Sequence, residues 1–67
     1  MSKRLNNCIY DKRLSKDITQ ESLAESIGVT RQTIIAIEKG NYTPSVALAL
    51  KLSAFFKTSV EELFWYD

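Results

Sequence analysis

Arg31 and Gln32 carry side chains that suit the edges of DNA bases. In a helix, which turns about 100° per residue, Ile34 and Ile37 point toward a core and a second set faces the other way. This outward arc consists of Arg31, Gln32, Ile35, Ala36 and Lys39. Arginine pairs with guanine and glutamine with adenine in the major groove, and small or apolar side chains meet a thymine methyl group. The pattern favours base reading, although composition alone favours an ordinary solvated face for Arg31 and Gln32.

The composition argues against catalysis and against a metal centre. The chain has 67 residues with one cysteine and no histidine, whereas most nucleophile and general-base chemistry relies on histidine or on a paired cysteine. Zinc sites draw on several Cys and His residues at set spacings. We therefore expect that the protein is not an enzyme and that it binds no metal and no cofactor. Cys8 is interpreted as a small core residue, because a free cysteine commonly behaves as a buried hydrophobe.

Length and charge indicate one small globular domain spanning residues 1–67. A hydrophobic fraction of 45% and a net charge of +1 are typical of folded proteins. A domain this short buries only roughly 60% of its unfolded surface, so it usually needs a disulfide, a metal or a partner subunit. Because the first two are lacking, we expect dimerisation. The longest apolar run, residues 46–50, is too short to cross a membrane, and the polar N-terminus lacks a signal-peptide core, which favours the cytoplasm.

Sparse glycine and proline, with little alternation of period two, predict an all-α fold: a compact bundle of five helices. The expected helices span residues 5–16, 20–26, 31–39, 46–56 and 60–66. A hydroxyl residue precedes each of the last four helices as a candidate N-cap, namely Thr19, Thr30, Ser45 and Ser59. Ser59 and Glu62 also match a capping box. Gly28 and Gly40 follow helix ends, where glycine is the usual residue for a left-handed turn.

The segment 19–40 has the pattern of a helix-turn-helix, in which the first short helix braces the second across a turn at Gly28. Four stretches between residues 19 and 45 match a known pattern: Thr19–Ala24, Ile27–Ile34, Ile37–Gly40 and Tyr42–Ser45. They resemble the Cro and phage-repressor helix-turn-helix family, also called the xenobiotic-response-element type. Residues 48–52 and 59–64 are similar to the family's fourth and fifth helices, so the resemblance covers nearly the whole chain.

The resemblance implies a lambda-repressor-like DNA-binding domain that regulates transcription in a prokaryote or a phage, usually as a homodimer. Position by position, Arg31, Gln32 and Ala36 match the base-facing sites of the recognition helix. Ile35 departs from the pattern, since most relatives carry a polar residue there. It is either a thymine-methyl contact or a single exposed apolar residue of no special meaning.

Polar residues around the two ends of the recognition helix are expected to contact DNA phosphates. Gln20 matches a helix start that meets the phosphate backbone in the family. The full expected set is Gln20, Thr30, Thr33, Lys39, Asn41, Tyr42 and Thr43. For the residues from Lys39 onward, the alternative is a polar loop closed by a glycine cap. Lys3 and Arg4 are either a basic arm that reaches DNA or solvent-exposed charges near a terminus.

The resemblance also implies a partly buried salt bridge between Arg13 and Glu38, which joins the first helix to the third. We interpret this pair as a device that orients the recognition helix. Removing one partner of such a pair leaves an uncompensated charge that costs roughly 3–5 kcal/mol, although the intact pair adds little net stability.

Two apolar stripes on the fourth expected helix, together with the aromatic C-terminal residues, exceed what so small a bundle can bury. Dimer interfaces are enriched in aromatic residues. The expected dimer interface consists of Leu48, Leu52, Phe55, Phe64, Trp65 and Tyr66. A two-fold dimer presents two recognition helices about 34–36 Å apart, which matches a near-palindromic operator.

The small net charge is the weak point of a DNA-binding interpretation. Residues 1–40 carry seven basic and five acidic side chains, and residues 41–67 carry two and three, so the basic surplus lies in the half that holds the motif. A modest number of phosphate contacts follows. We expect a sequence-specific transcriptional regulator that binds double-stranded DNA, and we favour a repressor over an activator. The alternative is an antitoxin-like or adaptor module that binds another protein through its apolar stripe and aromatic tail.

Overall fold

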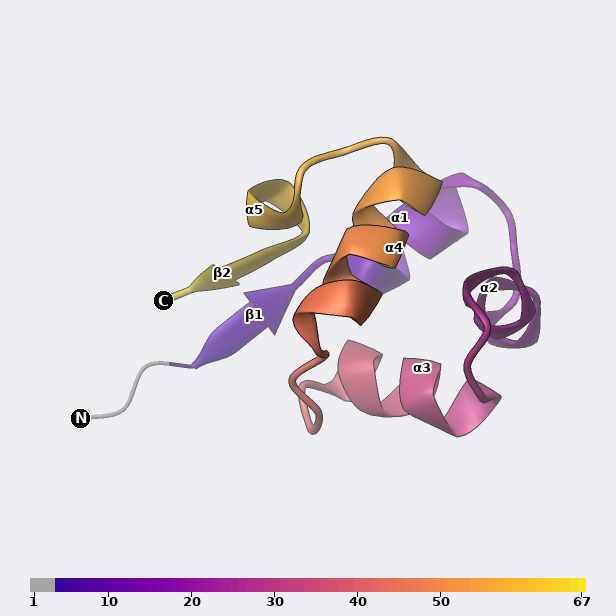
Figure 1. The fold of residues 1–67 in the computed structure, drawn as a ribbon, viewed down its shortest axis with the longest axis horizontal. Coiled ribbons are helices and arrows are strands. Elements are labelled where there is room, and N and C mark those ends of the chain that lie inside the picture. Colours follow the sequence, from indigo (N-terminus) through magenta and orange to yellow (C-terminus); the bar gives the residue numbers. More distant parts are fainter. Residues whose placement is uncertain (1–3) are drawn as a thin grey trace.

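The computed structural model describes residues 4–67, and this range holds five helices and two short strands. Their order is β1 (Leu5–Asn7), α1 (Ile9–Ser15), α2 (Gln20–Ile27), α3 (Arg31–Lys39), α4 (Val46–Phe56), α5 (Val60–Leu63) and β2 (Phe64–Tyr66). Figure 1 shows α3 along the lower edge of the molecule and the two strands side by side at one end. Within the described range, no helix is both long enough and apolar enough to cross a membrane.

Hydroxyl side chains begin four of the helices, as the sequence predicts. Each accepts a hydrogen bond from the backbone N–H three residues further on, and so satisfies a donor that a helix start leaves unpaired. The caps are Thr19 on α2, Thr30 on α3, Ser45 on α4 and Ser59 on α5. The predicted capping box is present on α5, and hydrogen bonds from Thr58 and Ser59 hold the pKa of Glu62 below its ordinary value.

An antiparallel ribbon of two strands joins the two ends of the described chain, and the sequence pattern does not predict it. The paired residues are Leu5 with Tyr66, Asn6 with Trp65, and Asn7 with Phe64. The expected all-α fold is therefore wrong in this respect: the first helix begins at Ile9 rather than at residue 5, and the fifth ends at Leu63 rather than at Tyr66. Strands of three residues are too short to show alternation, and each finds its partner at the other end of the chain.

All five helices contribute to one hydrophobic core. Six of its side chains are almost completely buried: Ile9, Leu23, Ile34, Ile37, Leu52 and Leu63. Leu48 lies in the same cluster. The expectation that Leu48 and Leu52 form a dimer interface is wrong, because the chain's own helices leave them only 7% and 0% exposed. The outward face of α4 instead carries Val46 and Leu50, which are 77% and 56% exposed. Since α4 is apolar nearly all round, its sequence does not reveal which stripe faces inward.

Leu52→Ala should lower the free energy of unfolding by about 2–5 kcal/mol, because the truncation leaves a cavity in the core. Leu14→Ala is the matched control: it makes the same change at a residue that is 50% exposed, and it should cost far less. Urea denaturation followed by circular dichroism, at one protein concentration, measures both. Equal losses for the two variants would contradict the assignment of Leu52 to the core.

Candidate nucleic-acid interface

Helix α3 turns one face to the core and the opposite face to solvent. Ile34 and Ile37 are buried against the other helices. The remaining arc is open to solvent in part or in full: Arg31, Gln32 and Lys39 are exposed, and Ile35 and Ala36 are half-buried. In Figure 1 no other element of residues 4–67 lies below α3, so this outward arc forms an edge of the molecule. A helix with one open edge can enter the major groove, which is about 12 Å wide.

A tight turn at Gly28 sets α2 against α3. Gly28 has φ of +88°, in the left-handed region that other residues rarely adopt. Its N–H and that of Val29 both donate to the Ala24 carbonyl, at 2.8 and 3.0 Å. Leu23 and Ile27 of α2 then pack in the same core as the inward face of α3. Helix α2 therefore braces α3 from behind and leaves the outward arc open.

A second left-handed glycine ends α3. Gly40 has φ of +78°, and the N–H of the next residue reaches back five residues to a helix carbonyl at 2.9 Å, as in a Schellman motif. Beside this cap, Lys39, Asn41, Tyr42 and Thr43 are all exposed. Four of the seven residues expected to contact phosphates therefore lie together at the C-terminal end of α3.

A buried ion pair joins α1 to α3 behind the outward arc. Arg13 Nε donates to Glu38 Oε2 at 2.7 Å and Arg13 Nη2 donates to Glu38 Oε1 at 3.2 Å, and the side chains are only 8% and 7% exposed. Arg13 Nη1 also donates to the Ile18 carbonyl at 3.0 Å, and Gln20 Nε2 donates to Glu38 Oε1 at 3.0 Å. Hydrogen bonding to Glu38 raises the pKa of Arg13 above its ordinary value. The salt bridge implied by the resemblance is present, and Gln20 extends it to α2.

The polar residues at the starts of α2 and α3 hold the helices in place. The Thr30 hydroxyl caps α3 and lies 3.2 Å from the hydroxyl of Thr33. Gln20 is half-buried and donates to the ion pair. Gln20 and Arg31 also line one hollow of about 430 Å³ between the two helix starts, and the acidic Glu21 lines it beside them. The structure thus brings the expected phosphate-contacting residues at this end close to Arg31. Thr30 forms the predicted cap, whereas Gln20 and Thr33 have side-chain partners that the sequence did not reveal.

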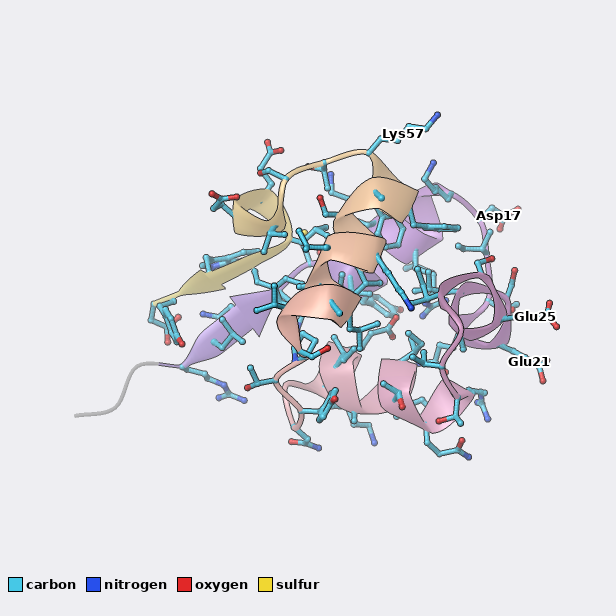
Figure 2. The ribbon with its side chains drawn as sticks, viewed as in Figure 1. Asp17, Glu21, Glu25 and Lys57 are labelled. Atoms are coloured by element: carbon cyan, nitrogen blue, oxygen red, sulfur yellow. The ribbon has the colours of Figure 1, made fainter. Side chains whose placement is uncertain are left out.

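Several acidic side chains lie around α2, to one side of the outward arc of α3 (Figure 2). Figure 2 shows three of them on the α2 side of the molecule: Asp17, Glu21 and Glu25. The carboxylate of Glu38, which α3 itself carries, is bound to Arg13 inside the protein. Helix α3 therefore exposes the cations Arg31 and Lys39 and no carboxylate, although the net charge of the chain is only +1.

Asn7 makes a contact that the sequence did not indicate. Its Nδ2 donates to the Ile37 carbonyl in the last turn of α3 at 2.9 Å, and its Oδ1 accepts from the Ile9 N–H at the start of α1 at 3.0 Å. The hydrogen bond from the Ile9 N–H to Asn7 has a signal in the sequence, because asparagine favours hydrogen bonds to a nearby helix start. The bond to α3 spans thirty residues of chain and has none.

Cys8 is half-buried and packs against the core. Its Sγ donates to the Glu62 carbonyl at 3.4 Å. Burial raises the pKa of the Cys8 thiol, so the thiol is protonated at neutral pH and a poor nucleophile. In the described range, no group of three or more His, Cys, Asp or Glu residues is arranged to hold a metal ion.

The aromatic residues expected at a dimer interface differ in exposure. Phe55 is half-buried and packs edge-to-face on Phe56, with ring centroids 5.1 Å apart. Phe64 is half-buried against the core. Trp65 and Tyr66 are 44% and 63% exposed on β2. Phe55 and Phe64 therefore serve mainly the chain's own core, whereas the last two aromatic side chains are open to solvent.

The chain is similar to known proteins over most of its length. A family model described as helix-turn-helix matches residues 9–63. An uncharacterized HTH-type transcriptional regulator from Methanocaldococcus jannaschii is 53% identical over 63 residues, which cover 94% of this chain and 96% of that protein. The uncharacterized HTH-type transcriptional regulator YgzD from Bacillus subtilis is 44% identical over the same shares.

Two further proteins have more specific names. The cryptic phage CTXphi transcriptional repressor RstR from Vibrio cholerae is 38% identical over 55 residues, covering 82% of this chain and 50% of the repressor. Among solved structures, the restriction-modification controller protein C.AhdI from Aeromonas hydrophila matches with a TM-score of 0.76 and 30% identity, over 84% of this chain and 85% of the other.

Arg13→Met or Glu38→Leu alone should lower the free energy of unfolding by about 3–5 kcal/mol, because each change leaves one buried charge without its partner. The variant with both changes removes both charges and should recover much of that loss. Chemical denaturation of the four proteins gives the coupling energy directly. If the losses of the two single variants simply add in the double variant, the pair is not a coupled unit.

Proposed function

The chain belongs to the helix-turn-helix family of DNA-binding transcriptional regulators, and we propose that it binds a specific site on double-stranded DNA as a homodimer with α3 in the major groove. The protein is a transcriptional regulator and not an enzyme. We assign residues 1–67 to a single DNA-binding domain. The observation that carries the proposal is the outward arc of α3, which is open to solvent along a helix anchored firmly from behind.

The outward arc of α3 is chemically matched to base edges. Arg31, at the start of the helix, has the fork of donors that pairs with two acceptors of guanine, and Gln32 beside it can pair with adenine in the same two-bond manner. Ile35 and Ala36 are half-buried and offer small apolar surfaces one turn further on. We assign them to thymine methyl groups, so the four side chains form one base-reading set.

Phosphate contacts at both ends of α3 would hold the helix in the groove. The proposed residues are Gln20, Thr30 and Thr33 at the N-terminal end, and Lys39, Asn41, Tyr42 and Thr43 at the C-terminal end. Such contacts fix register and orientation but do not themselves distinguish base sequences. Gln20 has two amide protons, and one hydrogen bond from its nitrogen goes to Glu38. A phosphate bound by the other proton would be linked through Gln20 to the buried ion pair.

Dimerisation would use the apolar side chains that the single chain leaves exposed. Of these, we leave Tyr10, Leu14 and Tyr42 outside the interface and assign to it Val46 and Leu50 on α4, with Trp65 and Tyr66 on β2. They replace Leu48 and Leu52 in the proposed interface, because those two lie in the core. A two-fold axis through such an interface would present two α3 helices to successive major grooves about 34–36 Å apart, and the matching operator would be near-palindromic.

Repression is the proposed direction of regulation. A protein that covers a promoter excludes polymerase from it without any further chemistry. The Vibrio cholerae relative is named as a transcriptional repressor, and this supports the same direction for the present chain. Because α3 exposes only two cations, we expect discrimination to depend more on base contacts than on non-specific attraction to phosphates.

Selection from a random pool of duplexes should enrich one two-fold symmetric site. The variant Arg31→Ala with Gln32→Ala should lose the preference for that site while staying folded, since each two-bond base contact supplies about 1–3 kcal/mol of discrimination. Fluorescence anisotropy against the enriched and a scrambled duplex, across a salt series, measures the preference. Lys57→Gln is the control, because Figure 2 shows Lys57 at the edge of the molecule opposite α3.

A double variant that retains the full preference would disprove the assignment of the base-reading set. If even the wild-type protein binds all duplexes weakly and equally, with binding that disappears as salt rises, the result would favour the antitoxin-like or adaptor function instead.

Leu50→Ala and Trp65→Ala should each raise the dissociation constant of the dimer by about tenfold or more, because each apolar loss counts twice in a two-fold interface. Analytical ultracentrifugation over a concentration series measures this constant. Leu14→Ala, at an exposed position on α1, is the matched control and should leave it unchanged. A wild-type protein that is monomeric at high micromolar concentration would contradict the dimer.

A further inference from the structure

A hollow of about 380 Å³ lies where the β1–β2 ribbon meets the C-terminal end of α3. Arg4 to Asn7 and Asp67 line it from the ribbon, and Glu38, Lys39 and Gly40 line it from the helix. Figure 1 shows the two strands on the same side of the molecule as the C-terminal end of α3. The ribbon therefore lies next to the last residues of the recognition helix across this hollow.

Arg4 is held in a defined position at the rim of this hollow. Its carbonyl accepts hydrogen bonds from the Asp67 N–H at 3.3 Å and from Asn6 Nδ2 at 3.4 Å. The ribbon itself is bound to α3 through Asn7, which donates to the Ile37 carbonyl at 2.9 Å. Of the two residues of the expected basic arm, Lys3 lies outside the described residues, and Arg4 is hydrogen-bonded to the ribbon.

The guanidinium of Arg4 lies beside Gly40. Arg4 Nη2 is 4.0 Å from the point that a Cβ atom on Gly40 would occupy, so the charge sits next to the helix end that also carries exposed Lys39. The ion pair found among residues 4–67 is the one between Arg13 and Glu38, which leaves the cations of Arg4 and Lys39 outside any ion pair in that range. The nearby Asp67 carboxylate accepts a hydrogen bond from Asn6.

We propose that Arg4, held by the β1–β2 ribbon beside the C-terminal end of α3, binds a phosphate of the DNA backbone and extends the interface beyond the recognition helix. This inference rests on the proposed function. The planar fork of donors on arginine matches phosphate oxygens, and Lys39 and the exposed loop at residues 41–43 lie at the same helix end. Through Arg4, the ribbon thus adds one contact with a DNA phosphate to each half of a dimeric complex.

A purely structural role for Arg4 makes a different prediction. A cation near the C-terminal end of a helix stabilises the helix dipole, and in that role Arg4 would affect the stability of the protein but not its contacts with DNA. The number of phosphate contacts separates the two roles, because each contact adds about 0.9 to the slope of log association constant against log salt concentration on duplex DNA.

The test compares Arg4→Gln with Lys57→Gln on the duplex enriched from the random pool. Each variant removes one positive charge per subunit and keeps a side chain of comparable length, and Lys57 lies at the edge opposite α3 (Figure 2). Arg4→Gln should lower the salt slope by about 1.8 for a dimer, with preference between duplexes unchanged, because two phosphate contacts are lost. Lys57→Gln should lower it far less. Arg4→Lys keeps the charge and should restore most of the slope.

If Arg4→Gln lowers the slope no more than Lys57→Gln does, while Arg31→Ala with Gln32→Ala still loses the site, the role of Arg4 is disproved and the proposed function stands. If Arg4→Gln also lowers the melting temperature, Arg4→Lys decides: a restored slope supports the phosphate contact, and an unrestored slope overturns it. A wild-type protein that prefers no duplex overturns the proposed function and this inference together.

Discussion

The buried ion pair between Arg13 and Glu38 governs how the helices of this protein sit on one another. Its two side chains are almost fully enclosed, so separating them would leave a charge in the interior without a partner, which is far more costly than keeping the pair. Glu38 lies on α3, and its carboxylate also binds Gln20 of α2. The pair therefore fixes the rotation of α3 about its own axis. That rotation decides which α3 residues face the core and which face outward.

Three further restraints act on the same helix, each at a different point along it. The turn at Gly28 sets its start against α2, the cap at Gly40 ends it, and Asn7 binds its last turn to the start of α1. The β1–β2 ribbon closes the chain behind Asn7. In a domain with so little buried surface, such specific contacts supplement a small core. They hold the outward arc rigid before any DNA is met, which lowers the cost of ordering it on binding.

The distribution of charge explains how a chain with a net charge of +1 can act on DNA. The only carboxylate on α3 is neutralised internally, and Asp17, Glu21 and Glu25 lie on the α2 side of the molecule (Figure 2). Among residues 4–67, three exposed cations lie on α3 and at the start of the ribbon, namely Arg4, Arg31 and Lys39, and three lie elsewhere, namely Lys16, Lys51 and Lys57. Few phosphate contacts mean weak non-specific binding, so in the proposed complex discrimination between sites would depend on base contacts and on the second subunit.

Local sequence signals determined much of this structure. The hydroxyl caps, the glycines at positions 28 and 40 and the helical period of residues 31–39 act within one or two turns of chain, and they correctly gave the starts of α2 to α5 and the faces of α3. The ribbon, the bond from Asn7 to α3 and the inward stripe of α4 were decided only by tertiary structure. The strands are too short for a periodic signal. Helix α4 is apolar nearly all round, so Leu52 rather than Leu50 is buried because the other helices pack against that stripe. Such contacts join residues that are far apart in the chain, and no local pattern encodes them.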